Sequence, residues 1–367
     1  MAHSEQRAQP QATAKDSASK KKTLRVVAIG GGTGLSTLLK GFKGYVVAPL
    51  ERPSHASAEH VISDLSAIVT VSDDGGSSGR LRKEFNMLPP GDIRSCIVAL
   101  SEDEALLSRL FQHRFAQGSG LQGHSFGNLF LAALTSITGD FSEAVRLSSE
   151  ILVTRGHIFP ATTSNVELEA LMEDGTRVRG ETRITASKGI IKELFLVPSD
   201  VGPLPQTLDA IARADLITIG PGSLFTSLIP NLLVRGISEG IAASSALKVY
   251  VCNLMTQANE SLGRTAADHI RALQDHAQAR IFDYALLNQT PASPEMKAKY
   301  ALEGATQVVS DLEAIQKLGV TPVLGDYLDE GNVARHATER IAHDLLRLQA
   351  TGESDRQRAS AHQGSAR

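Results

Sequence analysis

Cysteine is scarce in this chain: Cys96 and Cys252 are the only two among 367 residues. Both stand in apolar stretches, RSCIVAL and VYVCNL. Two isolated cysteines in such stretches argue against disulfide bonds and thiolate metal sites, and they indicate a reducing compartment. We therefore expect both side chains in the core of a cytoplasmic protein.

A strong net charge and a long apolar run are also missing. Because 37 Lys and Arg nearly balance 40 Asp and Glu, the formal charge of -3 gives no electrostatic reason to expect nucleic acid or an anionic membrane as a partner. The N-terminal stretch MAHSEQRAQPQATAKDSASKKK has no apolar signal segment, and no later run is long enough to insert into a membrane. The expected ligand is therefore a small molecule.

Short β-branched or apolar runs alternate with helical patterns along most of the chain. The runs that predict buried strands are 24–30, 67–71, 215–220, 248–253 and 282–288, and helical patterns follow at 35–42, 224–234 and 265–277. This alternation predicts an α/β fold with a doubly wound, mostly parallel sheet, and with ligands at the carboxyl ends of its strands.

Composition sets the expected domain boundaries. Residues 1–22 and 351–367 are rich in Ala, Ser, Gln, Lys and Arg without apolar periodicity, so we expect disordered tails there. A single α/β domain then covers 23–350. Its segment 92–150 is expected to be mainly helical.

One region interrupts the alternation of strands and helices. The runs VELEALM, RVRGETRI and KELFLVP surround Asp174 and Gly175, a pair typical of a type I′ hairpin. The sequence therefore predicts a small antiparallel β insert over 151–198.

Two glycine-rich loops each follow a predicted strand and precede a predicted helix, the context of a phosphate-binding turn. For the first loop a merely tight turn is the alternative, and for the second an N-cap serine is. Two such loops at the carboxyl ends of one sheet would converge on one crevice. The candidate ligand contacts are Gly31, Gly32, Thr33 and Gly34 in the first loop and Gly220, Gly222 and Ser223 in the second.

The stretch AIVTVSDDGGSSGRLR carries more charge than a turn needs. Paired carboxylates at a strand end suit a ribose hydroxyl or a divalent cation beside phosphates, and a Gly-Gly-Ser-Ser-Gly segment can form an anion nest. An acidic turn followed by a solvated helix face is the alternative. The candidates are Asp73 and Asp74, also as ligands of Mg²⁺, together with Gly76, Ser77, Arg80 and Arg82.

The next predicted helix follows Pro89, Pro90 and Gly91, and two charged residues lie at its start. Asp92 is expected to be its N-cap. Arg94 is a ligand candidate, because a guanidinium in the first turn opposes the helix dipole.

The segment GHSFG matches the Gly-x-Ser-x-Gly pattern of a nucleophile elbow, but no strand is predicted before it. Its polar side chains either donate to an anion at a helix N-terminus or form a capping cluster. A second polar loop follows the strand KVYVC and has the amides to bind a base or sugar hydroxyls. The candidates are His124, Ser125 and Asn128 in the first segment, and Asn253, Thr256 and Gln257 in the second.

Several long phrases, in this order, resemble a known family: GGGTGLSTLLKG, VTVSDDGGSSGRLR, LPPGDIRSC, GHSFGNL, TGDFSEAVRLSSEIL, IGPGSLFTSLIPNLLV and VYVCNLMTQ. They are similar to the gluconeogenesis factors, the YvcK branch of the CofD-like proteins, from about residue 24 to 347. The other branch comprises the 2-phospho-L-lactate transferases, which transfer a phospholactyl group from a guanosine diphosphate donor to a deazaflavin. The resemblance implies a Rossmann-like fold.

The resemblance also implies a ligand and a role. Members of the gluconeogenesis-factor branch bind uridine-diphosphate sugars such as UDP-GlcNAc, and they influence bacterial cell shape, morphogenesis and envelope synthesis during gluconeogenic growth. It assigns the loop 30–34, Asp73, Asp74, the loop 220–223 and Asn253 to the ligand crevice.

One position departs from the family pattern. Where the family often has Gly-Tyr-Thr or Gly-Tyr-Ser before Asp-His, this chain has Gly263, Arg264 and Thr265. Arg264 is therefore a candidate to stack on the ligand or to pair with its phosphate.

Three functions follow from these observations. The preferred one is a cytoplasmic regulatory protein that binds a nucleotide sugar and needs no cofactor to do so. The second is a metal-dependent 2-phospho-L-lactate transferase-like enzyme, although a chain without Trp and with 4% aromatic residues has little with which to hold a deazaflavin. The third is serine hydrolysis through Ser125. The sequence leaves open whether the protein forms a homo-oligomer and which protein partner receives its signal.

Overall fold

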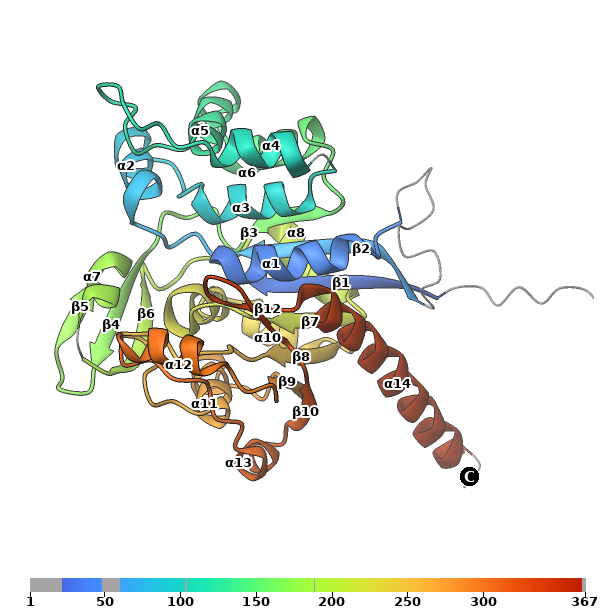
Figure 1. Ribbon diagram of the computed structural model, residues 1–367. Helices are drawn as coiled ribbons and strands as arrows, with labels where there is room; N and C mark the ends of the chain where they lie inside the picture. Colours follow the sequence, from blue (N-terminus) through green and yellow to red (C-terminus); the bar gives the residue numbers. More distant parts are fainter. Residues whose placement is uncertain (1–21, 48–59, 103, 188, 365–367) are drawn as a thin grey trace, which may run out of the picture.

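A parallel sheet of seven strands forms the centre of the described chain (Figure 1). The computed structural model describes residues 22–47, 60–102, 104–187 and 189–364. The strand order is β10-β9-β8-β7-β1-β2-β3, and all neighbours are parallel. The predicted α/β class with a doubly wound, Rossmann-like sheet is confirmed. The strands are β1 (Lys22–Gly30), β2 (His60–Val69), β3 (His157–Pro160), β7 (Leu216–Ile219), β8 (Leu247–Val251), β9 (Tyr284–Asn288) and β10 (Thr321–Gly325).

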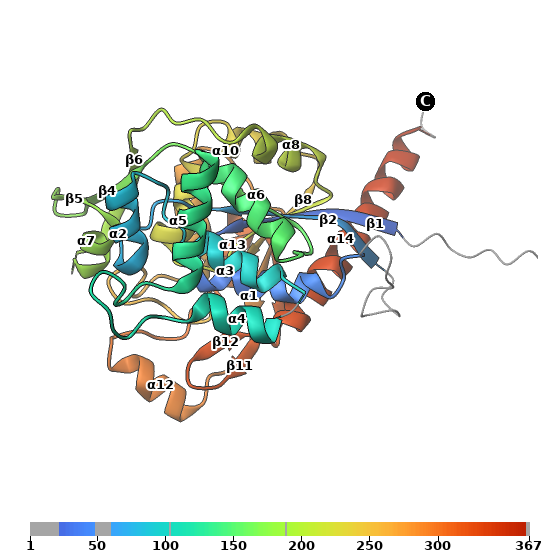
Figure 2. The same ribbon diagram turned by 90° about the horizontal axis from the view of Figure 1, so that it is seen from above.

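Helices cover both faces of this sheet. Both α1 and α8 contact β1, and Figure 2 shows them on opposite sides of β1 and β2, whereas Figure 1 shows α3, α4, α5 and α6 gathered at the β3 end of the sheet. Strands covered on both faces need apolar residues at every position, which is why the runs read from the sequence are continuous and not alternating. The helices are α1 (Gly32–Lys43), α2 (Gly76–Phe85), α3 (Gly91–Leu100), α4 (Glu104–Gln112), α5 (Phe126–Thr138), α6 (Phe141–Ile151), α7 (Glu181–Ala186), α8 (Pro205–Arg213), η1, a π-helix (Leu224–Leu228), α9 (Ile229–Leu232), α10 (Ile237–Ala243), α11 (Ala266–Ala277), α12 (Pro294–Ala301), α13 (Leu312–Lys317) and α14 (Thr338–Gly364).

The chain changes direction through the sheet between β1 and β7. From β1 it proceeds to β2 and β3 on one side, and from β7 it proceeds to β8, β9 and β10 on the other. Such a switch point opens a crevice at the carboxyl ends of the two strands. The loops that leave β1 and β7 there are the two glycine-rich loops.

The β insert is present, but its core is shorter than expected and its hairpin differs. A three-stranded antiparallel sheet, β5-β4-β6, holds β4 (Glu167–Met172), β5 (Arg177–Arg179) and β6 (Ile191–Val197), whereas the first strand in the expected range, β3, belongs to the central sheet. The type I′ prediction is wrong. In the pair Asp174-Gly175 only the glycine has a positive φ, of 84°, and its N–H donates to the Met172 carbonyl. This is the three-residue hairpin with a left-handed glycine at its end.

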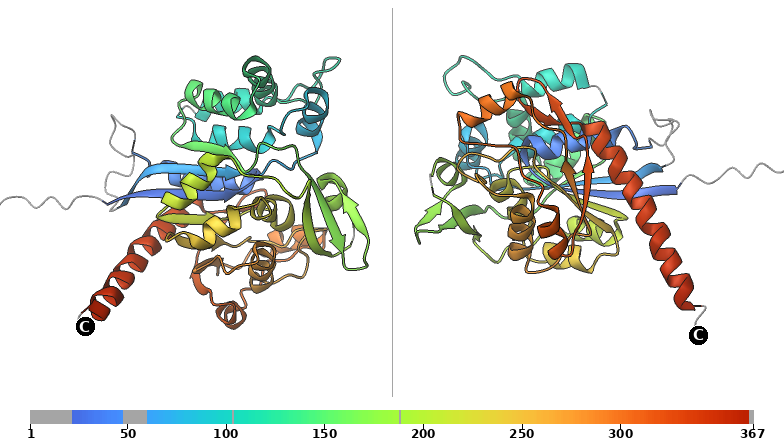
Figure 3. Two further views of the ribbon diagram at one scale, coloured as in Figure 1. Left: turned by 180° about the vertical axis from the view of Figure 1, so that it is seen from behind. Right: turned by 60° about the horizontal axis from the view of Figure 1, so that its bottom comes forward.

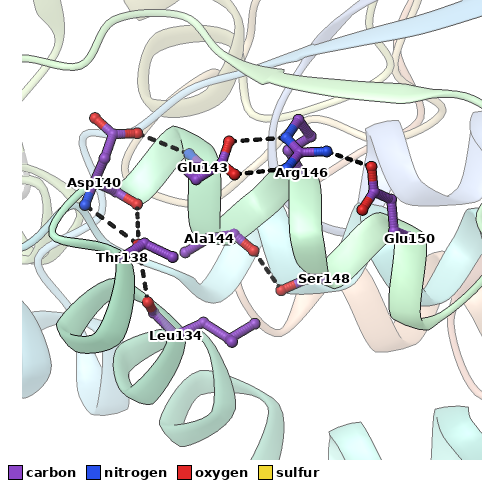
Figure 4. Close-up of polar contacts among 8 residues, drawn as sticks. All are labelled: Leu134, Thr138, Asp140, Glu143, Ala144, Arg146, Ser148 and Glu150. Carbon is purple, nitrogen blue, oxygen red and sulfur yellow. Dashed lines mark hydrogen bonds and ion pairs between the residues drawn. The ribbon is translucent and has the colours of Figure 1, made fainter.

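Local side chains define the helix that leads into the insert region (Figure 4). Asp140 caps α6, because its Oδ1 accepts a hydrogen bond of 2.7 Å from the Glu143 N–H. Arg146 pairs with Glu143 and with Glu150, one turn away on each side. Thr138 donates to the carbonyl of Asp140 at 2.8 Å and so fixes the turn between α5 and α6. The mainly helical segment 92–150 is thereby confirmed.

The carboxyl-terminal helix lies far from the insert. Figures 1 and 3 show α14 projecting on the side opposite the insert, and α1 packs against its first turns. It runs to Gly364, so the tail expected to begin at 351 is helical over most of its length. Residues 351–364 contain no proline and several strong helix formers, and this local propensity favours a helix over a disordered tail. At the other end, Lys22 already belongs to β1, and 1–21 lie outside the described residues.

A short hairpin precedes the last helix, and both cysteines lie in the core. β11 (Leu328–Glu330) and β12 (Ala334–His336) pair antiparallel just before α14. Cys96 and Cys252 are free and buried, as predicted. No helix in the described part of the chain combines the length and the apolar content needed to cross a bilayer.

Candidate ligand-binding crevice

The two glycine-rich loops touch each other at the switch point. A Cβ atom on Gly34 would lie 2.2 Å from the carbonyl oxygen of Pro221, and one on Gly31 would lie 2.5 Å from Thr70 Cγ2. Only residues without a side chain permit this approach. The predicted convergence of the loops is therefore realised in their backbones.

Polar side chains after β8 hold the second loop. Asn253 Nδ2 donates to the Gly222 carbonyl at 2.8 Å, and Asn253 Oδ1 accepts from the Gly222 N–H at 3.2 Å. Gln257 Nε2 donates to Ser223 Oγ at 2.8 Å. Ser223 occupies the N-cap position of η1 but makes no side-chain cap; the buried Glu260 does so instead, accepting from two backbone N–H groups of η1 at 2.8 Å each.

A cavity of about 380 Å³ opens between these loops, and we call it the loop cavity. It contains most of the predicted contacts from the two loops and from the segment after β8. It also contains the ring of Tyr300 from α12 and the strand β12, which the sequence did not point to. Its lining includes Thr33, Gly34, Thr37, Gly222, Ser223, Asn253, Thr256, Gln257, Tyr300, Arg335 and His336.

A second cavity, of about 650 Å³, shares Thr33, Thr37, Arg335 and His336 with the loop cavity, so the two lie side by side, and we call the pair the crevice. We call the second one the basic cavity. It is lined by four cationic and two anionic side chains: Lys40, Arg94, Arg114 and Arg335, with Asp329 and Glu330. Both acids already have partners, because Asp329 pairs with Arg340 at 3.0 Å and Glu330 accepts from the Ser293 N–H at 2.7 Å.

Arg94 is a half-buried cation in the wall of the basic cavity. Burial and the neighbouring charge of Arg114 lower its pKa, and its buried Nε has no hydrogen-bond partner. Among the described residues neither guanidinium forms an ion pair with a carboxylate: Arg94 donates to Ser95 Oγ at 3.3 Å, and Arg114 donates to the Gly123 carbonyl. The nearest carboxylate that acts on Arg94 is Asp92, which forms no ion pair with it, so two adjacent cations without an ion-pair partner in the described part of the chain favour an anionic ligand.

His336 is neutral where it lines both cavities. Its Nε2 donates to the Cys252 carbonyl at 3.0 Å, which leaves Nδ1 as an acceptor, and burial lowers its pKa to about 4. It adds a hydrogen-bond acceptor and no charge to the crevice.

The paired aspartates point to different partners. Asp73 Oδ1 accepts from the Gly75 N–H at 2.8 Å, and Asp73 also hydrogen-bonds to the Glu181 carboxyl. Asp74 Oδ1 accepts from the N–H and the hydroxyl of Thr182, at 2.9 and 2.6 Å. Within the described residues, no group of three or more His, Cys, Asp or Glu is arranged to hold a metal ion. A metal site at Asp73 and Asp74 stays a prediction, and in the fold each carboxylate accepts hydrogen bonds from a different partner.

Asp92 lies under the first glycine loop and not at the N-cap, which is Pro90. Its carboxylate accepts from the Gly32 N–H, and the residue is half-buried. Loss of hydration and the nearby charge of Asp73 raise its pKa to about 6. Burial and Asp73 likewise raise the pKa of Glu181.

The GHSFG segment forms a capping cluster. Ser125 is fully buried, caps α5 and accepts from the Asn128 N–H at 3.3 Å. Ser77 joins this segment to α2, since its hydroxyl lies 2.9 Å from His124 Nδ1 and 3.1 Å from Asn128 Nδ2. No strand precedes Ser125 directly, so the nucleophile-elbow geometry is absent from this described segment.

The remaining candidate side chains are held by backbone carbonyls. Arg80 donates to the Gln122 carbonyl at 2.8 Å, and Arg82 is buried and donates to the Val166 carbonyl. Arg264 donates to the Ile191 carbonyl at 2.9 Å and lies over the Phe225 ring. The structure thus places Arg264 between the insert and η1, outside the linings of the loop and basic cavities. Gly76 opens α2 at a φ of 47°, and Gly220 packs against the Val251 carbonyl.

Comparison with known proteins places most of the chain in a family. The family model described as 2-phospho-L-lactate transferase CofD matches residues 26–328. The chain belongs to the CofD family. Within this family its relatives are gluconeogenesis factors: that of Halalkalibacterium halodurans is 49% identical over 89% of this chain and 96% of its own, and that of Bacillus subtilis is 47% identical over 88% and 98%.

A solved structure supports the CofD-family fold. The crystal structure of a UPF0052-family protein from Bacillus halodurans is 48% identical to the chain and superposes with a TM-score of 0.82, over 89% of this chain and 99% of that one. The resemblance read from the sequence phrases is confirmed.

Sequence reasoning missed three residues of this CofD-family crevice. Tyr300 comes from a helix 47 positions after Asn253, and Arg335 and His336 come from β12. None lies beside a glycine loop in the sequence. For Arg335 and His336 the signal was a charged segment between the last strand of the sheet and the last helix, since loops often carry binding residues; Tyr300 had no such signal.

Proposed function

We propose that this CofD-family protein binds a nucleotide sugar of the UDP-sugar type in the crevice formed by the loop and basic cavities, and that it acts as a regulatory protein. The observation that carries the proposal is the pair Arg94 and Arg114, adjacent and without an ion-pair partner among the described residues, in a cavity that lies beside the loop cavity. A diphosphate there would supply the missing negative charge.

The rest of the crevice has the chemistry for the two ends of such a ligand. Thr256 and Gln257 line the loop cavity beside Asn253, and amide and hydroxyl groups read bases and sugar hydroxyls. The Tyr300 ring offers the flat apolar face on which a base or a sugar ring packs. The family often has a tyrosine at the position of Arg264, and in this chain the Tyr300 ring would stack on the ligand in its place.

The role in gluconeogenic growth rests on the relatives named gluconeogenesis factor, and the role in cell shape rests only on what the family resemblance implies. A transferase-like activity is the second candidate, favoured by the family model's description as a 2-phospho-L-lactate transferase. The two differ in turnover, because a regulatory protein returns its ligand unchanged, whereas the transferase releases a nucleoside monophosphate from a nucleoside-diphosphate donor.

The test is isothermal titration of the purified chain with UDP-GlcNAc, followed by analysis of the recovered nucleotide. Arg335→Gln removes one cation shared by both cavities, and Arg213→Gln, on the exposed surface of α8, is the matched control. We expect saturable binding that weakens by about tenfold or more in Arg335→Gln only, with UDP-GlcNAc recovered intact.

Two outcomes would reject the proposal. If UDP-GlcNAc does not bind, or if Arg335→Gln and Arg213→Gln behave alike, the crevice is not a site for this ligand. If a guanosine-diphosphate donor is converted to the nucleoside monophosphate, and Asp73→Asn abolishes the conversion, the transferase explains the family resemblance better.

A further inference from the structure

A separate cavity of about 610 Å³ lies between α2 and the β insert. We call it the insert cavity. It shares no lining residue with the loop or basic cavity, and its volume is in the range of small-molecule sites, about 300–1,000 Å³. The side chains and glycines of its wall are Asp74, Gly79, Arg82, Lys83, Asn86, Asn165, Glu167, Arg179, Gly180, Thr182, Arg183, Val197 and Pro198.

The charged groups of the insert cavity leave an excess of positive charge. Both acids are engaged: Glu167 pairs with Arg179 at 2.5 Å, and Asp74 accepts two hydrogen bonds from Thr182. Lys83 and Arg183 are exposed and form no ion pair among the described residues. Four cations thus face two acids that already have partners.

Arg82 gives a second, independent indication. Its side chain is 7% exposed, its Nε donates to Asn165 Oδ1 at 2.7 Å, and its Nη2 donates to the Val166 carbonyl. Its third nitrogen, Nη1, is buried and has no partner. A buried guanidinium N–H without an acceptor costs free energy, and native structures rarely leave one unsatisfied. An acceptor supplied by a ligand would remove this cost.

The positions of these groups are fixed by the fold. Arg82 is held by hydrogen bonds to Asn165 and Val166, which precede β4, and Lys83 follows it on α2. Arg183 stands on α7, whose first turn is held by Asp74. Among the described residues, the hydrogen bonds that join α2 and the insert do not use Arg82 Nη1, Lys83 or Arg183. These three groups are therefore available to one bound group.

We propose that the insert cavity binds a small phosphorylated molecule, whose phosphate group contacts Arg82, Lys83 and Arg183. Phosphate oxygens are the acceptors that several converging Arg and Lys donors recognise best. Asn86 and Thr182 supply neutral groups for the remainder of the ligand. This site is distinct from the nucleotide-sugar crevice and does not depend on it.

Calorimetric titration of the full chain tests the proposal, with inorganic phosphate, glucose 6-phosphate and glucose as probes. The site variant is Lys83→Gln combined with Arg183→Gln, and Lys192→Gln, an exposed lysine of β6 in the same insert, is the matched control. We expect both phosphorylated probes to bind and glucose not to bind. We expect the double variant to lose about tenfold or more in affinity, while Lys192→Gln binds as the parent chain does.

The probes and one further variant separate the alternatives. Tighter binding of glucose 6-phosphate than of inorganic phosphate identifies an organic phosphate as the ligand, and equal binding identifies free phosphate. If neither phosphorylated probe binds, the proposal is overturned. It is also overturned if the double variant binds both normally while Arg335→Gln does not, because the phosphate then belongs to the crevice. An unchanged melting temperature of the double variant excludes misfolding, because both side chains are exposed.

Discussion

Asn253 makes two hydrogen bonds to the backbone of Gly222: its Nδ2 donates to the Gly222 carbonyl at 2.8 Å, and its Oδ1 accepts from the Gly222 N–H at 3.2 Å. A side-chain amide carries a donor and an acceptor on one carbon, which is the spacing that this contact needs. It couples the loop after β8 to the loop after β7, so the two ends of the loop cavity keep their relative position.

Asn253→Ala should therefore weaken binding more than it weakens the fold. Loss of both hydrogen bonds frees the 220–223 loop, and we expect the affinity for UDP-GlcNAc to fall by about tenfold or more, with a loss of about 1–2 kcal/mol in the free energy of unfolding. Calorimetry and urea unfolding measure the two effects. Asn332→Ala, in the exposed turn between β11 and β12, is the control. Equal affinities for the two variants would show that the clamp does not shape the site.

Gly34→Ala tests the contact between the glycine loops. Gly34 lies in α1, where alanine is favoured over glycine by about 1 kcal/mol. The added Cβ would lie 2.2 Å from the Pro221 carbonyl oxygen, however, and overpacking of this kind costs about 1–3 kcal/mol or more. Because the contact is with backbone, we expect a net loss of stability in urea unfolding and weaker UDP-GlcNAc binding.

Gly331→Ala is the matched control for this variant. A Cβ at Gly331 would meet no atom within 4 Å, and its φ is not positive. Stability equal to or above that of the parent chain is expected there. A stable Gly34→Ala variant with normal binding would contradict the close packing of the two loops.

The sequence predicts this fold well where one local rule decides. Continuous apolar runs identify β1 and β7, because strands covered on both faces need no polar positions. Thr265 caps α11 as its side chain predicts, with Asp268 completing the capping box. The hairpin at Asp174 fails because a dipeptide preference does not distinguish a two-residue turn from a three-residue one.

The site is less predictable, because long-range contacts decide which polar groups meet. Asp73 and Asp74 are adjacent in the sequence but turn to different partners, Glu181 and Thr182. Arg335 reaches the crevice from a hairpin that follows the last strand of the sheet. No spacing rule connects residues this far apart, whereas the two glycine loops could be paired because the topology of parallel strands places them at one edge.

Nucleotide-sugar binding should not require a metal ion. Asp74 is engaged by Thr182, and the basic cavity offers Lys40, Arg94, Arg114 and Arg335 to neutralise a diphosphate. We expect the same dissociation constant for UDP-GlcNAc in EDTA and in Mg²⁺, measured by calorimetry, and a strong weakening in high salt because the attraction is electrostatic. Loss of binding in EDTA, restored by Mg²⁺ in the parent chain but not in Asp73→Ala, would instead assign a metal to Asp73.

The protonation of Asp92 should make stability depend on pH. Its pKa is raised from an ordinary 3.8 to about 6, so between about pH 4 and 6 the native state keeps a proton that the unfolded state releases. Stability therefore falls as pH rises through this window, and the difference in pKa corresponds to up to about 3 kcal/mol. Asp92→Asn removes the titration, while its amide oxygen can still accept from the Gly32 N–H.

Urea unfolding of both chains at pH 4, 5, 6 and 7 measures this effect directly. We expect the advantage of Asp92→Asn over the parent chain to be smallest at pH 4, to grow up to about pH 6 and then to stay constant, since the native carboxylate is ionised above its pKa. Asp209→Asn, on the exposed surface of α8, controls for the loss of one negative charge. A constant difference from pH 4 to 7 would mean that Asp92 is ionised throughout, and that a full negative charge lies beneath the first glycine loop. Added UDP-GlcNAc should extend the test, because a bound diphosphate favours the protonated carboxyl and should shift the window to higher pH.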